Sequence, residues 1–315
     1  MAARLPLRLL LFNAIFWPCF AGLDARHGAF LAEREQDRLR TIERLKSRPV
    51  VFFGDSHVEC SIVEDDAHRI LNVGTSSEHY VFTLQKLRLL HPKTAVVGVG
   101  VHNFQPYYAS TLGPVFLSNY DFWAPHFQGS ERGDVVRSLD LESRFFARLR
   151  GVVPFLGSAL GETLWAKRKG LGGFVDRGTE SDVGEEALRV RLEEAFGTTS
   201  DAPLPIQAAY LDQLLAYGES EGIRMVLLSA PVCRRYREAI PPPAERAFRE
   251  LVAELLRKHR FRHWDYSREP IEDRFFRDPD HLNLPGAEWF TKEMLCRLER
   301  EGDLPPSGEC PPPSS

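Results

Sequence analysis

The sequence predicts an α/β protein built on a parallel β-sheet. Five short apolar runs have the composition of strands buried on both faces of a sheet: 50–53, 70–73, 94–99, 224–229 and 261–265. Segments with the length and periodicity of helices lie between or after them: 80–90, 207–221, 244–259 and 285–300. Because strands that alternate with helices are joined by right-handed crossovers, we expect a parallel sheet with helices on both faces.

The first 26 residues differ from the rest of the chain. Arg4 and Arg8 precede an uncharged apolar run of about fifteen residues, a pattern typical of a signal anchor or a signal peptide. The run contains aromatic residues of the interfacial kind and is followed by no good cleavage site, which favours an uncleaved anchor in the membrane. We therefore expect residues 27–315 to lie outside the cytoplasm, at the periplasmic or cell surface, and to be secreted if the segment is cleaved.

The remaining sequence divides into three parts, the second of which carries an insertion. Residues 27–48 are rich in Glu, Arg and Leu and predict a connecting helix, and residues 49–304 form the α/β domain. Within that domain the strand and helix alternation lapses over about 114–205, which predicts a helical cap insertion, because ordinary connections are only a few residues long. The tail 305–315 is dominated by proline and serine and is expected to be disordered.

Composition excludes some classes of function. The 315 residues carry a formal net charge of -4, whereas nucleic-acid-binding domains are usually basic, so no nucleic-acid partner is predicted. Four cysteines lie outside the apolar segment, with no spacing typical of a metal or redox site: Cys60, Cys233, Cys296 and Cys310. Either free buried thiols or two disulfides are compatible with them. No metal or cofactor is predicted, and the sequence does not indicate an oligomeric state.

Two short motifs at opposite ends of the domain carry the candidate chemistry. Gly54-Asp55-Ser56-His57 directly follows the first predicted strand, and Asp278-Pro279-Asp280-His281-Leu282-Asn283 precedes the last helix. A serine hydroxyl becomes a good nucleophile when an imidazole takes its proton and a carboxylate orients that imidazole. The two motifs contain all three groups, and they predict Ser56 as nucleophile, His281 as base and Asp278 as the orienting carboxylate.

Each of these assignments has a neighbouring alternative. His57 could replace His281 as the base, although a side chain next to the nucleophile rarely has suitable geometry. Asp280 is adjacent to His281 and could replace Asp278 as its partner. Because ligands in open α/β sheets bind outside the carboxyl ends of the strands, Gly74, His102 and Asn103 are further candidates, since they follow the second and third predicted strands.

With these residues in place, the chain resembles the SGNH, or GDSL-like, hydrolase superfamily. The resemblance rests on four blocks: Gly54-Asp55-Ser56, Gly74, Gly100 to Asn103, and Asp278-x-x-His281. It covers about 50–104 and 207–298 and leaves the insertion unmatched. The amino-terminal anchor and the Asp-His-Leu-Asn before Leu-Pro-Gly look more like the membrane-associated branch near alginate O-acetylation and teichoic-acid D-alanylation proteins than like secreted lipases. The resemblance implies a three-layer, flavodoxin-like fold.

The resemblance also implies roles for the residues of the site. Ser56 attacks an acyl carbonyl, His281 takes and returns the proton, and Asp278 orients His281. The backbone N–H groups of Ser56 and Gly74 and one side-chain amide hold the oxyanion. The family pattern is Gly-x-Asn-Asp, whereas this chain has Gly100-Val101-His102-Asn103, so Asn103 is the expected amide and His102 is its alternative.

Two functions from different classes follow. The first is an extracytoplasmic acyl-ester hydrolase or O-acyltransferase that works through an acyl-serine and takes an acyl ester or an acylated cell-envelope glycan. The second is a noncatalytic SGNH-fold protein that binds a cell-envelope glycan or an assembly partner. The displaced amide at His102 and the long insertion motivate the second hypothesis.

Overall fold

The computed structural model describes residues 42–43, 45–46, 48–64, 69–118, 126–138, 172–197 and 202–310, and the side chains of 113–118 are not among those described. The predicted signal anchor, most of the predicted connecting helix and the middle of the insertion lie outside these residues. Among the helices described, none has both the length and the apolar character needed to span a membrane.

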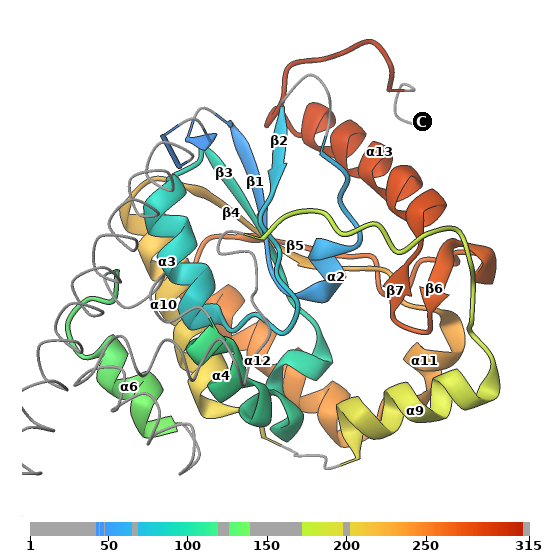
Figure 1. Ribbon diagram of the computed structural model, residues 1–315. Coiled ribbons are helices and arrows are strands. Elements are labelled where there is room, and N and C mark those ends of the chain that lie inside the picture. The colour runs from blue at the N-terminus through green and yellow to red at the C-terminus, as the bar shows by residue number, and fades with distance from the viewer. Residues whose placement is uncertain are drawn as a thin grey trace, which may run out of the picture.

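The centre of the domain is a five-stranded parallel sheet in the order β2-β1-β3-β4-β5 (Figure 1). Its strands are β1 (Val50–Phe53), β2 (Ile70–Asn72), β3 (Thr94–Gly98), β4 (Arg224–Ser229) and β5 (Arg262–Asp265). The five predicted strands are confirmed to within a residue at each end. The predicted α/β class with a parallel sheet is therefore confirmed.

Helices cover both faces of this sheet and give the predicted three layers (Figure 1). One face carries α3 (Tyr80–Leu90), α10 (Pro205–Ser220) and α12 (Pro242–Lys258). The other carries α13 (Leu284–Arg300), with α2 (Ser56–Glu59), α9 (Glu185–Phe196) and α11 (Arg234–Ala239) near its carboxyl edge. The remaining helices described are α4 (Pro106–Ser118), α6 (Glu131–Ser138), and the 3-10 turns η1 (Val101–Phe104) and η2 (Asp273–Phe275).

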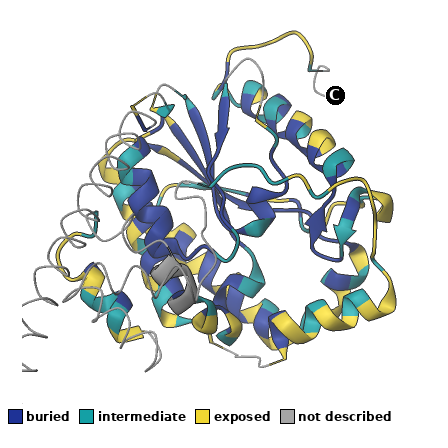
Figure 2. Cartoon of the chain, viewed as in Figure 1, coloured by how far each residue is buried: buried dark blue, intermediate teal, exposed yellow. Residues whose placement is uncertain are grey.

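The strands are continuous runs of apolar residues because both faces of the sheet are buried in the core. Successive side chains of a strand point to opposite faces, so Val51 and Phe53 pack under α3 and α10 while Val50 and Phe52 pack under α13. All four side chains are fully buried, as the dark strands of Figure 2 show. Both faces must therefore be apolar, as is usual for a parallel sheet between two helical layers.

A small antiparallel hairpin precedes the last helix. It consists of β6 (Phe276–Asp278) and β7 (His281–Leu282), which pair Asp278 with His281 across the two residues Pro279 and Asp280. Asn283 then begins α13, because its side-chain Oδ1 accepts the Gly286 N–H at 3.0 Å. The sequence predicted the helix but not the hairpin.

The insertion lies between β3 and β4, and only part of what is described there is helical. Residues 172–183 form an extended segment with neither helix nor strand. This segment crosses the end of the sheet, where the Gly173 N–H donates to Gly74 O at 3.1 Å and the Val175 N–H donates to Glu59 O at 3.0 Å. Gly172 has φ +89°, and a Cβ there would collide with Gly74 O, so the crossing needs glycine.

The four cysteines form one disulfide, whereas the sequence was compatible with either four free thiols or two disulfides. Cys296 of α13 is joined to Cys310 by a disulfide, whereas Cys60 and Cys233 are free and buried. Residues 305–310 contain no helix or strand but are held to the domain by this bond. The rest of the tail predicted to be disordered, 311–315, lies outside the described residues.

Candidate active site

A tight turn at the end of β1 places Ser56. Gly54 has φ +148°, and a Cβ there would lie 2.7 Å from Val58 Cγ2 and 3.2 Å from the backbone of Gly98. Glycine therefore lets the chain leave β1 close to β3 and enter α2 at once. Asp55 caps α2 by accepting the His57 N–H on its Oδ1 at 3.0 Å, and Ser56 becomes the first residue of the helix.

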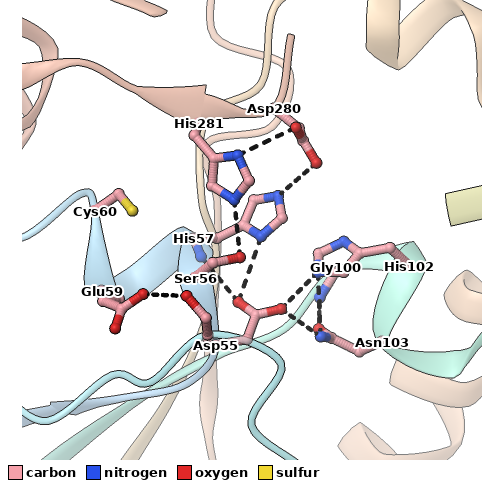
Figure 3. A network of polar contacts seen from close by, with 12 residues as sticks. Asp55, Ser56, His57, Glu59, Cys60, Gly100, His102, Asn103, Asp280 and His281 are labelled. Atoms are coloured by element: carbon pink, nitrogen blue, oxygen red, sulfur yellow. Dashed lines mark hydrogen bonds and ion pairs between the residues drawn. The ribbon is translucent and has the colours of Figure 1, made fainter. Parts of the chain in front are cut away.

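Ser56, His281 and Asp278 meet in the geometry of a catalytic triad (Figure 3 shows the first two). Ser56 Oγ lies 2.8 Å from His281 Nε2, although 225 positions separate the two residues in the sequence. His281 Nδ1 lies 2.9 Å and 3.1 Å from the two carboxylate oxygens of Asp278. Ser56 is half-buried while its flanking residues Asp55 and His57 are buried, so the nucleophile is the accessible member of its turn. These contacts suit transfer of the serine proton to the imidazole.

The β6–β7 hairpin explains how Asp278 reaches His281. The two residues are opposite one another in the hairpin, and Asp278 Oδ1 also accepts the backbone N–H groups of His281 at 3.0 Å and Asp280 at 3.2 Å. The turn is tied to the domain because the Cys233 N–H donates to Pro279 O at 2.9 Å. The carboxylate is thereby fixed on the Nδ1 side of the ring, which leaves Nε2 for Ser56.

Asp280 is a second carboxylate on the same side of His281. Its Oδ1 is 3.3 Å from His281 Nδ1, longer than either contact of Asp278, and its side chain is almost fully buried. Arg191 of α9 binds it with both ends of the guanidinium, Nε to Oδ1 at 2.8 Å and Nη2 to Oδ2 at 2.7 Å. Sequence reasoning missed Arg191, which lies 89 positions from Asp280 in the insertion and belongs to no local motif.

The two carboxylates control the charge on His281. Burial of the ring lowers the pKa of His281, but Asp280 and Asp278 outweigh burial and raise its pKa to about 10. Burial likewise raises the pKa of Asp280, yet His281 and Arg191 beside it hold the pKa of Asp280 well below its usual range. The imidazolium form of His281 is therefore strongly stabilised, as a base that must hold a proton during the reaction requires.

His57 does not contact the Ser56 hydroxyl and lies between two other imidazoles. Its ring is stacked on His102 with centroids 4.1 Å apart, and its centroid is 4.9 Å from that of His281. Its nitrogens have no hydrogen-bond partner among the described residues, although Nδ1 is 3.4 Å from Asp55 Oδ1 and Nε2 is 3.6 Å from Asp280 Oδ2 (Figure 3). Burial and the neighbouring His102 lower the pKa of His57. His281, rather than His57, is thus the imidazole in hydrogen-bond contact with the Ser56 hydroxyl.

Asp55 is the centre of a second buried network. Its Oδ2 accepts hydrogen bonds from His102 Nε2 and Asn103 Nδ2, both at 2.7 Å, and from the Tyr108 hydroxyl. Burial raises the pKa of Asp55, but His57 and His102 hold the pKa of this carboxyl well below its usual range. Tyr108 of α4 was not identified from the sequence, because nothing in its surroundings marks it as a partner of the first motif.

Gly74, Asn103 and His102, which were predicted to hold the oxyanion, donate hydrogen bonds to other protein groups in this structure. The Gly74 N–H donates to Asn72 Oδ1 at 2.8 Å, and a Cβ on Gly74 would lie 2.6 Å from Glu59 N, so this glycine allows close packing against α2. Asn103 and His102 are both bonded to Asp55. The Ser56 N–H, by contrast, has no acceptor among the described residues. Oxyanion binding by Gly74, Asn103 or His102 stays a prediction.

Two groups of ligand atoms could in principle hold a metal ion, Asp55-His57-His102 and His57-Asp280-His281, and each has its atoms within 4.8 Å of one another. Asp280 is already bonded to the Arg191 guanidinium, whose charge opposes a cation there. Asp55 is already bonded to His102 and Asn103. These groups are therefore engaged with one another as proton donors and acceptors.

A pocket of about 290 Å³ adjoins this network at the carboxyl ends of β3, β4 and β5. His57, His102 and Tyr236 are among its lining residues, and the buried Tyr236 hydroxyl has no hydrogen-bond partner in the part of the chain that the structure describes. Phe248 and Val252 of α12 give it an apolar wall. The pocket offers room for an apolar group next to Asp55 and His57, which flank Ser56 in the sequence, whereas Ser56 and His281 are not among its lining residues.

Comparison with known proteins found similar folds at low similarity. A GDSL-like lipase from Bacteroides thetaiotaomicron is 10% identical over 83% of this chain and 91% of its own, with a TM-score of 0.39. A protein described as an acylhydrolase from Bacteroides fragilis is 9% identical over 85% of this chain and 97% of its own, also with a TM-score of 0.39. No protein-family model and no curated protein matches the sequence. At such low similarity, only the residues of this chain bear on its function.

Proposed function

We propose that the protein is a serine ester hydrolase or O-acyltransferase that works through an acyl-serine on Ser56. The observation that carries this proposal is the 2.8 Å contact between Ser56 Oγ and His281 Nε2, with Nδ1 of the same ring bonded to Asp278. An accessible serine bonded to a buried, oriented imidazole is the arrangement that nucleophilic catalysis needs. The fold alone would not justify the assignment.

The proposed reaction has two steps. Neutral His281 takes the proton from the Ser56 hydroxyl while Oγ attacks the ester carbonyl, and the ring then gives that proton to the departing alcohol. In the second step His281 takes a proton from water or from an acceptor hydroxyl as its oxygen attacks the acyl-serine carbonyl, and the ring returns that proton to Ser56 Oγ when the ester bond to the serine breaks. Asp278 keeps the Nδ1 proton in place throughout. The N–H of Ser56 is the donor best placed to hold the oxyanion, because it begins α2 and has no protein acceptor among the described residues.

We further propose that the domain works outside the cytoplasm on an acylated cell-envelope glycan, as in the membrane-associated branch that the sequence resembles. Two features support this location. The amino-terminal segment pairs Arg4 and Arg8 with an apolar run, and Cys296 is bonded to Cys310, a linkage found mainly in oxidising compartments. The pocket beside His57 would accept the apolar part of an acyl group.

Labelling with a fluorophosphonate tests the nucleophile. Wild-type protein should be labelled and should hydrolyse p-nitrophenyl acetate, whereas Ser56→Ala should lose the label and about a thousandfold or more of the turnover. Ser220→Ala is the matched control, because Ser220 is exposed at the end of α10 and its hydroxyl donates to the Tyr217 carbonyl within the same helix. Equal labelling of the wild type and Ser56→Ala would remove the proposal. Addition of an oligosaccharide then separates hydrolysis from transfer, by the appearance of acylated sugar in mass spectra.

One observation favours a second candidate, a noncatalytic protein that binds a cell-envelope glycan. The donors of Gly74, Asn103 and His102 are all bonded to other protein groups, so the side-chain amide expected for an oxyanion is not directed at Ser56. For this candidate, neither the wild type nor Ser56→Ala should react with the fluorophosphonate, and both should bind envelope glycan equally in calorimetry.

A further inference from the structure

Helix α9 belongs to the insertion, but it is firmly attached beside the catalytic hairpin. Ala195 and Phe196, at its carboxyl end, are buried in the core, and the Phe196 ring lies 6.1 Å from that of Tyr236 in α11. At the other end, the Leu188 N–H donates to Gly184 O, and the preceding segment is bonded to the hairpin through Asp182 N–H and Arg277 O. Side chains of α9 can therefore hold fixed positions relative to His281.

Arg191 is the residue of α9 that reaches the hairpin. Its guanidinium meets both oxygens of Asp280 at 2.7 Å and 2.8 Å, and its Nη1 bonds Glu194 on the same helix at 2.6 Å. The Asp280 side chain is 1% exposed and that of Arg191 is 28% exposed. A bidentate pair between a buried carboxylate and an arginine is both strong and strictly oriented.

Several charged or titratable groups surround His281, and their arrangement shows how the Arg191–Asp280 pair can affect the charge of the ring. Asp278 and Asp280 face its Nδ1, and Ser56 and His57 of α2 lie on the side of Nε2 and against the ring. Farther out are Arg191, bonded to Asp280, and Tyr236 of α11. Arg177 of the 172–183 segment is also farther out; it bonds Cys60 Sγ at 2.9 Å and lies 4.0 Å from Glu59. Arg191 is the cation bonded directly to a carboxylate that faces the catalytic ring.

We propose that Arg191 is a positioning residue of the active site: through its bidentate pair with buried Asp280 it offsets the negative charge that this carboxylate presents to Nδ1 of His281. The insertion thus sets the basicity of the catalytic imidazole through one side chain. Without Arg191, Asp280 would keep its charge and stabilise the imidazolium more strongly, so that less neutral His281 would be present to accept the serine proton. The kinetic part of this proposal rests on the proposed function, whereas its electrostatic part does not.

Titration of His281 by ¹H–¹⁵N NMR of its ring tests the electrostatic part without any need for turnover. We expect Arg191→Gln to raise the pKa of His281 by about one unit, since an uncompensated carboxylate near a histidine typically has an effect of that order. Arg191→Lys keeps the cation but cannot span both oxygens, so it should raise the pKa less. Arg189→Gln is the matched control, because Arg189 is exposed on the same helix and pairs only with Glu186 and Glu193. His281→Gln identifies the signal.

The role of Asp280 is tested by combining variants. In an Asp280→Asn background, Arg191→Gln should leave the pKa of His281 nearly unchanged, because the charge that Arg191 offsets is gone. At neutral pH the single Arg191→Gln variant should lose about tenfold in kcat/KM, which is one pKa unit. An unchanged or lowered His281 pKa in both Arg191 variants overturns the proposal, as does an equal shift in Arg189→Gln. A shifted pKa in a protein whose Ser56 fails to react overturns only the proposed function.

Discussion

At the scale of single residues, the site is unusual in presenting two carboxylates to one imidazole. Asp278 makes the shorter contacts, at 2.9 Å and 3.1 Å, and is held by the backbone of its own hairpin. Asp280 stands at 3.3 Å and is held by Arg191. We interpret Asp278 as the group that fixes the tautomer of His281 and Asp280 as a charge that tunes it. The two roles can be distinguished by how a substitution of each residue changes the dependence of kcat and kcat/KM on pH.

Because the pKa of His281 is raised to about 10, its neutral form becomes the majority only above that pH. Activity that needs neutral His281 should therefore increase as pH rises from 6 toward 10, by about tenfold per unit. Asp280→Asn removes one of the charges that raise this pKa, so it should move the rising limb of kcat/KM to lower pH. Asp278→Asn should also lower this pKa, but it should in addition lower the maximal kcat by about a thousandfold or more, because the ring loses its tautomer control. A rising limb displaced to higher pH in Asp280→Asn would contradict this division.

Sequence reasoning singled out Ser56, Asp278 and His281, which lie in contact in the structure, because each stands in a short motif whose spacing has a mechanical meaning. The hairpin of Asp278 and His281 is formed within four residues, so its geometry is local. Arg191 and Tyr108 could not be found in this way. Arg191 meets Asp280 through the packing of α9 in the insertion, and Tyr108 meets Asp55 through the packing of α4, which begins before the insertion; the partners are 89 and 53 positions apart in the chain.

At the scale of elements, α2 is a four-residue helix that is supported by the last residue of β2 and by the loop that follows it. Asn72 Nδ2 donates to Val58 O at 3.0 Å and to Ile62 O at 2.7 Å, which fixes the helix that carries Ser56. The loop itself is held by Lys86 of α3, whose Nζ bonds Val73 O at 2.5 Å, Thr75 Oγ1 at 2.9 Å and the Glu78 carboxylate. The loop therefore depends on a buried lysine.

Replacing Lys86 should destabilise the whole domain. Burial raises the pKa of Glu78 to about 7 even with Lys86 beside it, so removal of the lysine leaves a carboxyl with little compensation. We expect Lys86→Met to lower the free energy of unfolding by about 3 kcal/mol, as for other broken buried pairs. Lys86→Met combined with Glu78→Gln should recover part of the loss, and exposed Lys93→Met should change little. Denaturant unfolding measures all three, and an unchanged stability in Lys86→Met would show that the loop does not depend on the pair.

The elements also show which part of the fold sequence patterns can reveal. The five strands and the helices α3, α10, α12 and α13 were predicted because burial on two faces, or on one, leaves a regular pattern of apolar residues. The segment 172–183 leaves no such pattern. It is bonded through backbone groups to Gly74 and Glu59, and it needs glycine at 172, but neither feature produces a periodic pattern of apolar residues.

At the scale of the whole molecule, the parallel sheet brings together residues from most of the chain length. Ser56 comes from the end of β1, Asn103 from beyond β3 and Arg191 from the insertion before β4, while His281 follows β5 (Figure 1). Only a fold that is assembled as one unit can align them, because no two of these four residues share an element. Constraints far from the site, such as the Cys296–Cys310 bond at the end of α13, should therefore affect the whole domain.

The disulfide gives a test of both stability and compartment. It joins two cysteines that are 14 positions apart, and for a loop of this length chain entropy predicts about 3 kcal/mol of stabilisation. Cys310→Ser should therefore lower the unfolding midpoint. The Cys310→Ser variant and the reduced wild type should unfold at the same midpoint. Maleimide labelling of denatured wild type should add two more groups after reduction than before it, because Cys60 and Cys233 are free in both states. If the domain matures outside the cytoplasm, this difference should be present in protein isolated from intact cells with thiols blocked at lysis, since reducing compartments rarely keep such bonds. Equal labelling before and after reduction would contradict the bond and remove its support for an extracytoplasmic domain.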